Sequence, residues 1–243
     1  MGNKHQDNPR ATVKARAVAP ASVATTAATD GRRARRTGAR DRILTAAVDL
    51  FYREGLRTTG IDRIIAEAGV AKASFYEHFE SKDALMEAYV RVRAAAFDEW
   101  FDAWMAARFE GLPAGAAMPG ERERLLASVD AVADFTRRPD FLGCAFIGAV
   151  EQIDDASHPA RKAAEGHRQK LRASLAALAD GAGSPDPEQL GLSLLMLADG
   201  LMVAARAAKS RVERERAAAA TRAAWRAVVE AGLAPRTTEP TNH

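Results

Sequence analysis

Side chains able to donate hydrogen bonds to phosphate are concentrated between residues 59 and 82 of this 243-residue chain. Hydroxyl, imidazole and ammonium groups can all donate to a phosphate oxygen, and a lysine can also reach O6 and N7 of guanine in the major groove. Such groups could therefore hold the phosphates of a nucleic acid. The candidates considered below are Thr59, Lys72, Ser74, Tyr76, His78 and Lys82.

Residues that could carry catalysis are scarce. The only conceivable pair of nucleophile and base is Cys144 with His158 or His167, and Cys144 stands in an apolar stretch typical of a buried helix. A single cysteine also excludes a disulfide framework and a cysteine-rich zinc site. We therefore expect no enzyme activity, no metal and no cofactor. A redox-sensing role for Cys144 stays open, and it would require an exposed thiol of low pKa.

The composition predicts an all-α fold. Hydrophobic residues make up 47% of the chain but aromatic residues only 6%, so the apolar content is mostly Ala, Leu and Val, which favours closely packed helices. Every candidate membrane span is interrupted by Arg, Asp or Glu before it reaches the ~18 apolar residues that are needed. We expect a soluble cytoplasmic protein that does not bind a membrane.

The basic excess lies in the first 37 residues, which carry eight Lys or Arg against two Asp. The segment is rich in Ala, Ser and Thr and lacks the apolar stretch of a secretory signal, so we expect a disordered basic arm over 1–37. Its arginines could neutralise phosphates or enter a minor groove, although a solvated run of charge is an equal alternative. They are Arg32, Arg33, Arg35 and Arg36.

Helical periodicity predicts a DNA-binding head over residues 38–85. A first helix spans 40–54, and Gly55 follows it where a left-handed residue would end a helix. Thr59 is a plausible N-cap for a second short helix that ends at Gly69. A third short helix follows the tight turn at Gly69, and two short helices around such a turn form a helix-turn-helix.

A larger helical region is predicted over 86–234, before a polar disordered tail at 235–243. Ser81 can cap a long helix that reaches toward residue 109 and links the two parts of the chain. A nearly all-apolar helix is expected at 141–152, where only burial on all sides would suit it. Ser157 provides the N-cap position of the helix that follows.

The segment 59–85 resembles the DNA-binding domain of TetR family regulators. The matching motifs are Thr59, Ile65-Ala66, Ala68-Gly69-Val70, Tyr76-Glu77-His78-Phe79, Ser81-Lys82 and Leu85. The resemblance implies a three-helix helix-turn-helix domain, followed by a C-terminal helical domain for ligand binding and dimerisation. It also implies a transcriptional regulator, by family default a repressor.

The resemblance assigns phosphate contacts to Thr59, Tyr76, His78 and Lys82. Lys72, Ala73 and Ser74 open the predicted recognition helix, and Lys72 is the candidate base reader; the alternative for Lys72 is a plain surface lysine. Ala71 provides no side-chain cap for this helix, and Glu77 puts a negative charge beside the DNA.

A homodimer is expected because one helix-turn-helix reads only a few base pairs of a palindromic operator. The helix predicted at 188–208 has two apolar sides, so it needs two partners. With the helix at 212–231 it could form half of a four-helix interface, in which Gly191 and Gly200 would let backbones approach; burial within one subunit is the alternative.

A small hydrophobic ligand is the expected signal, held in a cavity of the C-terminal domain. It would act by favouring a conformation whose heads are spaced wrongly for DNA. Two alternatives remain, a filled aromatic core and a regulator or architectural protein without a small-molecule ligand. The candidate lining residues are Trp100, Trp104, Phe135, Phe141 and Phe146, with Cys144, Glu151 and His167 as polar contacts.

Overall fold

The computed structural model describes residues 38–110 and 120–235, and this part of the chain forms nine helices and no strand. The prediction of an all-α fold is therefore confirmed. The basic arm and all but the first residue of the tail lie outside the described residues. The helices are α1 (Ala39–Glu54), α2 (Ile61–Ala68), α3 (Lys72–His78), α4 (Lys82–Phe109), α5 (Glu121–Thr136), α6 (Ala145–Gln152), α7 (Pro159–Gly181), α8 (Pro187–Ala207) and α9 (Arg211–Gly232).

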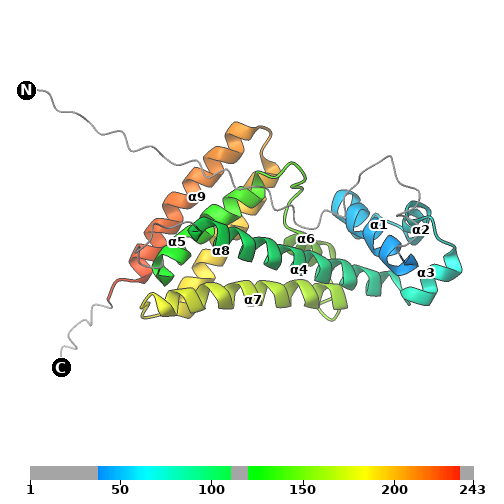
Figure 1. Ribbon diagram of the computed structural model, residues 1–243, viewed down its shortest axis with the longest axis horizontal. Helices are drawn as coiled ribbons and strands as arrows, with labels where there is room; N and C mark the ends of the chain where they lie inside the picture. The colour runs from blue at the N-terminus through cyan, green and yellow to red at the C-terminus, as the bar shows by residue number, and fades with distance from the viewer. Residues whose placement is uncertain (1–37, 111–119, 236–243) are drawn as a thin grey trace, which may run out of the picture.

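Helices α1, α2 and α3 form a small head at one end of the molecule (Figure 1). Helix α1 buries Ile43 and Leu50, α2 buries Ile64, and α3 contributes Phe75, which is fully buried. In α1 and α2 the buried residues recur at three- and four-residue spacing, as at Ala46 and Leu50 or Ile64 and Ala68, so each helix presents one apolar face to the others. The shared core fixes the orientation of α3 relative to α1 and α2.

The loop between α1 and α2 differs from the prediction. Thr59 is not the N-cap of α2: Gly60 occupies that position, and no side chain caps the helix. The Thr59 hydroxyl instead donates to the carbonyl of Gly55 at 2.8 Å, and the residue is 1% exposed. The turn at Gly69 is as predicted, because Gly69 has φ +61° and its N–H donates to the last carbonyls of α2.

Helices α4 and α7 run side by side along the length of the molecule (Figure 1). Helix α4 begins in the head, where the Ser81 hydroxyl accepts from the N–H of Ala84 and caps it as predicted. Helix α7 is capped by His158, not by Ser157, since the His158 ring nitrogen accepts from the N–H of Ala160. The long α4 joins the head to the rest of the chain without a break.

Helix α6 is shorter than predicted. Residues 141–144 precede it in a non-helical conformation, because Gly143 has φ +116°, and the helix begins only at Ala145. Its burial is one-sided within the chain, with Phe146 and Ala149 inside and Glu151 exposed. Cys144 therefore lies at the N-cap of α6 and not within the helix.

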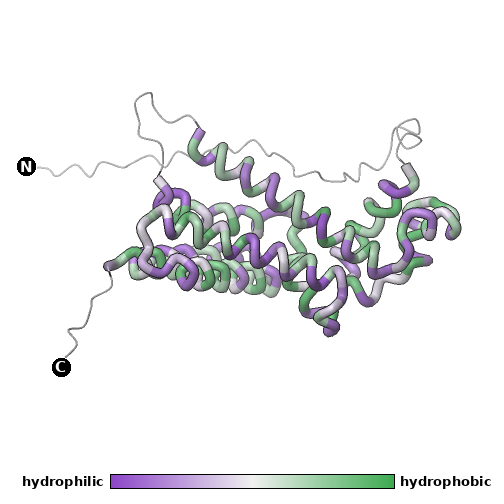
Figure 2. Tube along the Cα trace, turned by 90° about the horizontal axis from the view of Figure 1, so that it is seen from below, coloured by the Kyte–Doolittle hydropathy of each residue, from purple (hydrophilic) through white to green (hydrophobic). Residues whose placement is uncertain are grey.

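Helices α8 and α9 complete a bundle with α5 and α7, and hydrophilic and hydrophobic residues alternate along the helices (Figure 2). Trp225 of α9 is buried in this bundle, and its indole N–H donates to the carbonyl of Leu125 at 2.9 Å. Among the described helices, α8 alone is long and apolar enough to cross a membrane by composition. Its inner face packs in the core, as expected of a core helix.

Close approach of α7 and α8 depends on Gly191. A Cβ at that position would lie 2.8 Å from the backbone nitrogen of Ala176, whereas a Cβ at Gly200 would meet nothing within 4 Å. The prediction that Gly191 lies between subunits is thus wrong, because the backbone it approaches belongs to its own chain. Gly200 remains exposed on the outer face of α8.

We expect Gly191→Ala to lower the free energy of unfolding by about 1–3 kcal/mol, because the helix backbone of α7 must move to admit the methyl group. Gly166→Ala is the matched control on α7, where the added Cβ meets nothing within 4 Å. It should raise stability by about 0.5–1 kcal/mol through helix propensity alone. Urea unfolding measures both, and equal effects of the two substitutions would contradict the close approach.

Candidate DNA-binding face and ligand cavity

Helix α3 presents a polar outer face to solvent. Phe75 and Phe79 hold its inner face in the core, while Tyr76 is 48% exposed and braced edge-on against the Phe75 ring. Lys72, Ala73 and His78 are exposed as well, and Ser74 is half-buried. The residues predicted for the recognition helix are thus at least partly accessible to solvent.

Lys72 is not free on this surface. Its ammonium lies 3.1 Å from the carboxylate of Asp62 on α2, and the hydrogen bond to that carboxylate raises the pKa of Lys72. Both side chains are largely exposed, so the pair is weak and can exchange for another acceptor. Asp62 was not predicted as a partner of Lys72. The two residues are ten positions apart in the sequence, on the two helices of the motif.

Lys82 and Thr59 are held differently from the exposed donors. The Lys82 ammonium donates to the carbonyl of Arg57 at 3.2 Å, and partial burial lowers its pKa. Lys82 thereby ties the first turn of α4 to the loop after α1. Thr59 is buried and offers no hydroxyl to the surface; its role in this structure is to close that loop.

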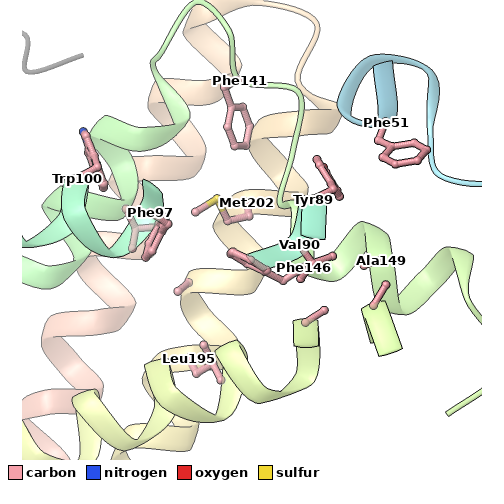
Figure 3. Close-up of a cluster of buried hydrophobic side chains, with 14 of the residues drawn as sticks. Phe51, Tyr89, Val90, Phe97, Trp100, Phe141, Phe146, Ala149, Leu195 and Met202 are labelled. Carbon is pink, nitrogen blue, oxygen red and sulfur yellow. The ribbon is translucent and has the colours of Figure 1, made fainter. Parts of the chain in front are cut away.

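A cavity of about 1120 Å³ lies in the C-terminal part of the chain, between α4 and α7 and against α5, α6, α8 and α9. Of the predicted lining residues, Phe135, Cys144 and Phe146 border it. Phe97 of α4 lies at their centre, in ring contact with Phe135 and with Phe146. Figure 3 shows Phe97 of α4, Met202 of α8 and Phe146 of α6 close to one another, with Leu195 of α8 farther along.

The other predicted lining residues do not border this cavity. Trp100 and Phe141 are buried against Phe135. The Trp104 indole N–H donates to Asp134 at 3.0 Å. Glu151 is exposed and borders a separate cavity near the head.

His167 is buried beside the cavity, 6% exposed, and its ring lies 4.1 Å from that of Phe146. Its Nε2 has no hydrogen-bond partner in the described part of the chain. Burial lowers the pKa of His167, opposed by the carboxylate of Asp98. Near neutral pH the ring is therefore uncharged and contributes mainly to packing.

The polar residues of the cavity wall were not predicted from the sequence. Arg168 of α7 forms a two-point hydrogen bond with Asp199 of α8 at 2.5 and 2.8 Å. Arg93 of α4 also borders the cavity, and its guanidinium lies over the ring of Tyr52 at 4.1 Å. Arg93 lies four residues before Phe97 and therefore on the same face of α4, and this spacing was the available signal.

The Tyr52 hydroxyl attaches the segment before α6 to the head through two hydrogen bonds, which we call the clasp. Its hydroxyl accepts from the N–H of Leu142 at 2.9 Å and donates to the carbonyl of Gly143 at 2.8 Å. Near the end of α1, the N–H of Leu56 donates to Gln152 Oε1 at 2.8 Å. Both ends of α6 are therefore hydrogen-bonded to the head.

The same segment borders the large cavity. Gly143 and Cys144 line both the large cavity and a second one of about 520 Å³ that lies against α1. Burial raises the pKa of the Cys144 thiol, which keeps it protonated near neutral pH. This environment argues against the redox-sensing alternative and leaves Cys144 as part of a wall shared by cavity and head.

Comparison with known proteins gives the family. The model of bacterial regulatory proteins of the tetR family matches residues 43–89. The crystal structure of SCO4454, a TetR-family regulator from Streptomyces coelicolor, is 31% identical with a TM-score of 0.69, over 81% of this chain and 96% of that one. The chain belongs to the TetR family. This membership confirms the resemblance found in 59–85 and the prediction of a regulator in place of an enzyme.

Two HTH-type transcriptional regulators are similar to shorter parts of the chain. The transcriptional regulator Rv1255c of Mycobacterium tuberculosis is 45% identical over 65 residues, 26% of this chain and 32% of its own length. The transcriptional repressor KstR2 of Rhodococcus jostii is 36% identical over 56 residues, 23% of this chain and 28% of its own. The chain thus aligns with about a third of the length of these relatives.

We expect Tyr52→Phe to lower the free energy of unfolding by about 1–3 kcal/mol, because it leaves the N–H of Leu142 and the carbonyl of Gly143 without the hydroxyl. Tyr76→Phe removes a hydroxyl of the same kind from an exposed ring and serves as the control. Its effect should stay within about 0.5 kcal/mol. Urea unfolding at neutral pH compares the two, and equal losses would show that the clasp contributes nothing.

Proposed function

We propose that this TetR family regulator is a homodimeric, sequence-specific repressor that acts in the cytoplasm and leaves a palindromic operator when a small hydrophobic ligand binds. The main support for this proposal is that one unbroken helix, α4, connects the head to the large cavity. The head presents the exposed recognition face on α3. TetR family regulators bind double-stranded DNA as dimers, and one relative is named a repressor.

The cavity favours a ligand-responsive regulator over one without a ligand. A regulator governed only by partners would be expected to have a filled core, whereas a volume of about 1120 Å³ is at or above the upper end of the usual range for ligand pockets. A bound molecule can change DNA affinity only through a different affinity for two conformations of the chain. The clasp between α1 and the cavity wall provides a physical route for that difference.

The dimer is proposed through α8 and α9. Met196, Gly200, Val203 and Ala207 follow one another at three- and four-residue spacing on the outer side of α8 and are all exposed. Met196 is 66% and Val203 54% exposed, which is unusual for side chains of this size on a helix whose other face is buried. An apolar stripe of this kind fits a second copy of the same helix in a two-fold arrangement.

Selection of genomic fragments by the purified protein at about 150 mM salt, followed by footprinting, tests the proposal as a whole. The expected result is a protected palindrome with half-sites about one DNA turn apart. Recovery of no preferred sequence by folded protein would contradict sequence-specific repression.

Two lysine variants separate base reading from phosphate contact on the selected fragment. Lys72→Ala should weaken binding by roughly tenfold, mainly through one base position, because a lysine there can reach a guanine edge. Lys82→Ala should weaken binding to all sequences and reduce the salt slope by about one. Fluorescence anisotropy across salt concentrations measures both, and uniform loss on every sequence would refute the role given to Lys72.

Val203→Asp should convert the dimer into a monomer, because a carboxylate would be buried in the apolar stripe of the opposing α8. Ala173→Asp places the same charge on an exposed position of α7, away from this stripe, and should leave the mass unchanged. Light scattering after size exclusion measures the mass of each variant. A Val203→Asp protein that remains dimeric would locate the interface elsewhere.

A further inference from the structure

The large cavity is elongated along α4. Its lining begins at Arg93 and continues on the same helix to Phe109, a span of about 24 Å at 1.5 Å per residue. On the opposite side it follows α7 from Arg168 to Leu178. A long, narrow molecule fits this outline better than a compact one.

Most of the wall is apolar. Phe97, Phe101, Met105 and Phe109 recur on one face of α4, and Leu171 and Leu175 of α7 face the same space. The carboxylates of Asp102 and Glu110 stand at exposed positions on α4, where water screens them. An alkyl chain or a similar apolar body would therefore fill the greater part of the cavity.

One cation of the inner wall lacks an ionic partner. Arg168 is paired with Asp199, Lys170 with Asp98 at 2.6 Å, and Arg124 with Glu121 at 3.6 Å. Arg93 has no carboxylate within 4 Å in the described part of the chain.

The influence of Asp140 on Arg93 is limited. Arg93 contributes to lowering the pKa of Asp140, but that carboxylate is hydrogen-bonded by Arg138 at 2.7 Å. Tyr52 covers one face of the Arg93 guanidinium. The N–H groups at the edge of the guanidinium remain available, and they match the two oxygens of a carboxylate.

The start of α6 lies at the same end of the cavity. Ala145 and Phe146, its first two residues, border the cavity beside Cys144 and Gly143. The backbone N–H groups of Phe146 and Ile147 interact with the Cys144 sulfur, and the dipole of the helix adds a partial positive charge at this end. The positive end of the cavity is thus next to the segment that Tyr52 clasps.

We propose that the cavity binds an elongated amphipathic acid, with its carboxylate on the edge of Arg93 and its apolar body along α4. The inference rests on the proposed ligand-responsive function and names the class of ligand. Since Arg93 also lies on the Tyr52 ring, the carboxylate would bind beside the residue that ties the head to α6. The charged end of the ligand is therefore the part best placed to change the clasp.

Three probes of equal chain length test the charge preference on the full-length protein without DNA: dodecanoate, dodecanamide and dodecyltrimethylammonium, all below their micelle concentrations. Tryptophan fluorescence reports binding, because Trp225 borders the cavity. Dodecanoate should bind at least about tenfold more tightly than the amide, and the cation more weakly than both. Arg93→Gln should remove the preference for the acid, and Arg93→Lys should restore part of it.

Arg91→Gln is the matched control, since Arg91 lies two residues away, is paired with Glu87 and does not border the cavity. It should keep the full preference. Four outcomes would overturn the proposal. In the unchanged protein they are equal affinities for acid and amide, a preference for the cation, or no binding of any probe. The fourth is a preference for the acid that survives Arg93→Gln. Operator selection uses protein without any of these probes. A failure of the proposed repressor function would therefore be distinguishable from a failure of the proposed acid binding.

Discussion

The hydrogen bonds between the Tyr52 hydroxyl and the Leu142–Gly143 backbone are the constraint on which the arrangement of the molecule depends. Tyr52 belongs to α1 of the head, and the backbone that it holds precedes α6 and forms part of the cavity wall. Gln152 fixes the other end of α6 to the loop after α1. With both ends of α6 attached, the head cannot turn relative to the cavity unless these bonds break or the segment moves with it.

Apolar packing reinforces this attachment. Phe51 of α1 and Tyr89 of α4 meet edge to face at 5.6 Å, and the cluster in Figure 3 extends from them to Phe97 and Phe146 at the cavity. Helix α4 carries Tyr89, Arg93 and Phe97 on successive turns. A change at the cavity end of this helix is therefore transmitted through close-packed side chains and not through a flexible linker.

An occupied cavity changes DNA affinity only to the extent that its ligand favours one placement of the head over another. The half-buried polar contacts at Tyr52 suit such a two-state element, since each hydrogen bond contributes a modest net free energy. The head has its own buried core, which includes Phe75 and Ile64. The proposed response to a ligand therefore requires the recognition face to move together with this core.

The head was predictable from sequence because its signals are local. Gly69, Ser81 and the spacing of Phe75 and Phe79 each act within a few residues of their position, and the structure has the turn, the cap and the inner face that they indicate.

The cavity was predictable only in part. The aromatic residues indicated α4, α5 and α6 but not α8 and α9, which also border the cavity. The choice between a wall residue and a core residue, as between Phe135 and Trp100, depends on packing between distant segments. The start of α6 was missed for the same reason, because Gly143 is held by Tyr52, 91 residues away. Thr59 was misplaced because its hydroxyl satisfies a carbonyl within its own loop.

The most direct test of this account is the distance between the two heads of the dimer, measured between spin labels by pulsed electron resonance. Glu80→Cys, in a Cys144→Ala background, places one label on the exposed surface of each head. With Tyr52 in place, we expect one narrow distance between the two labels. After Tyr52→Phe, we expect the distribution of this distance to be shifted or broadened. Superimposable distributions would show that the clasp does not set the position of the head.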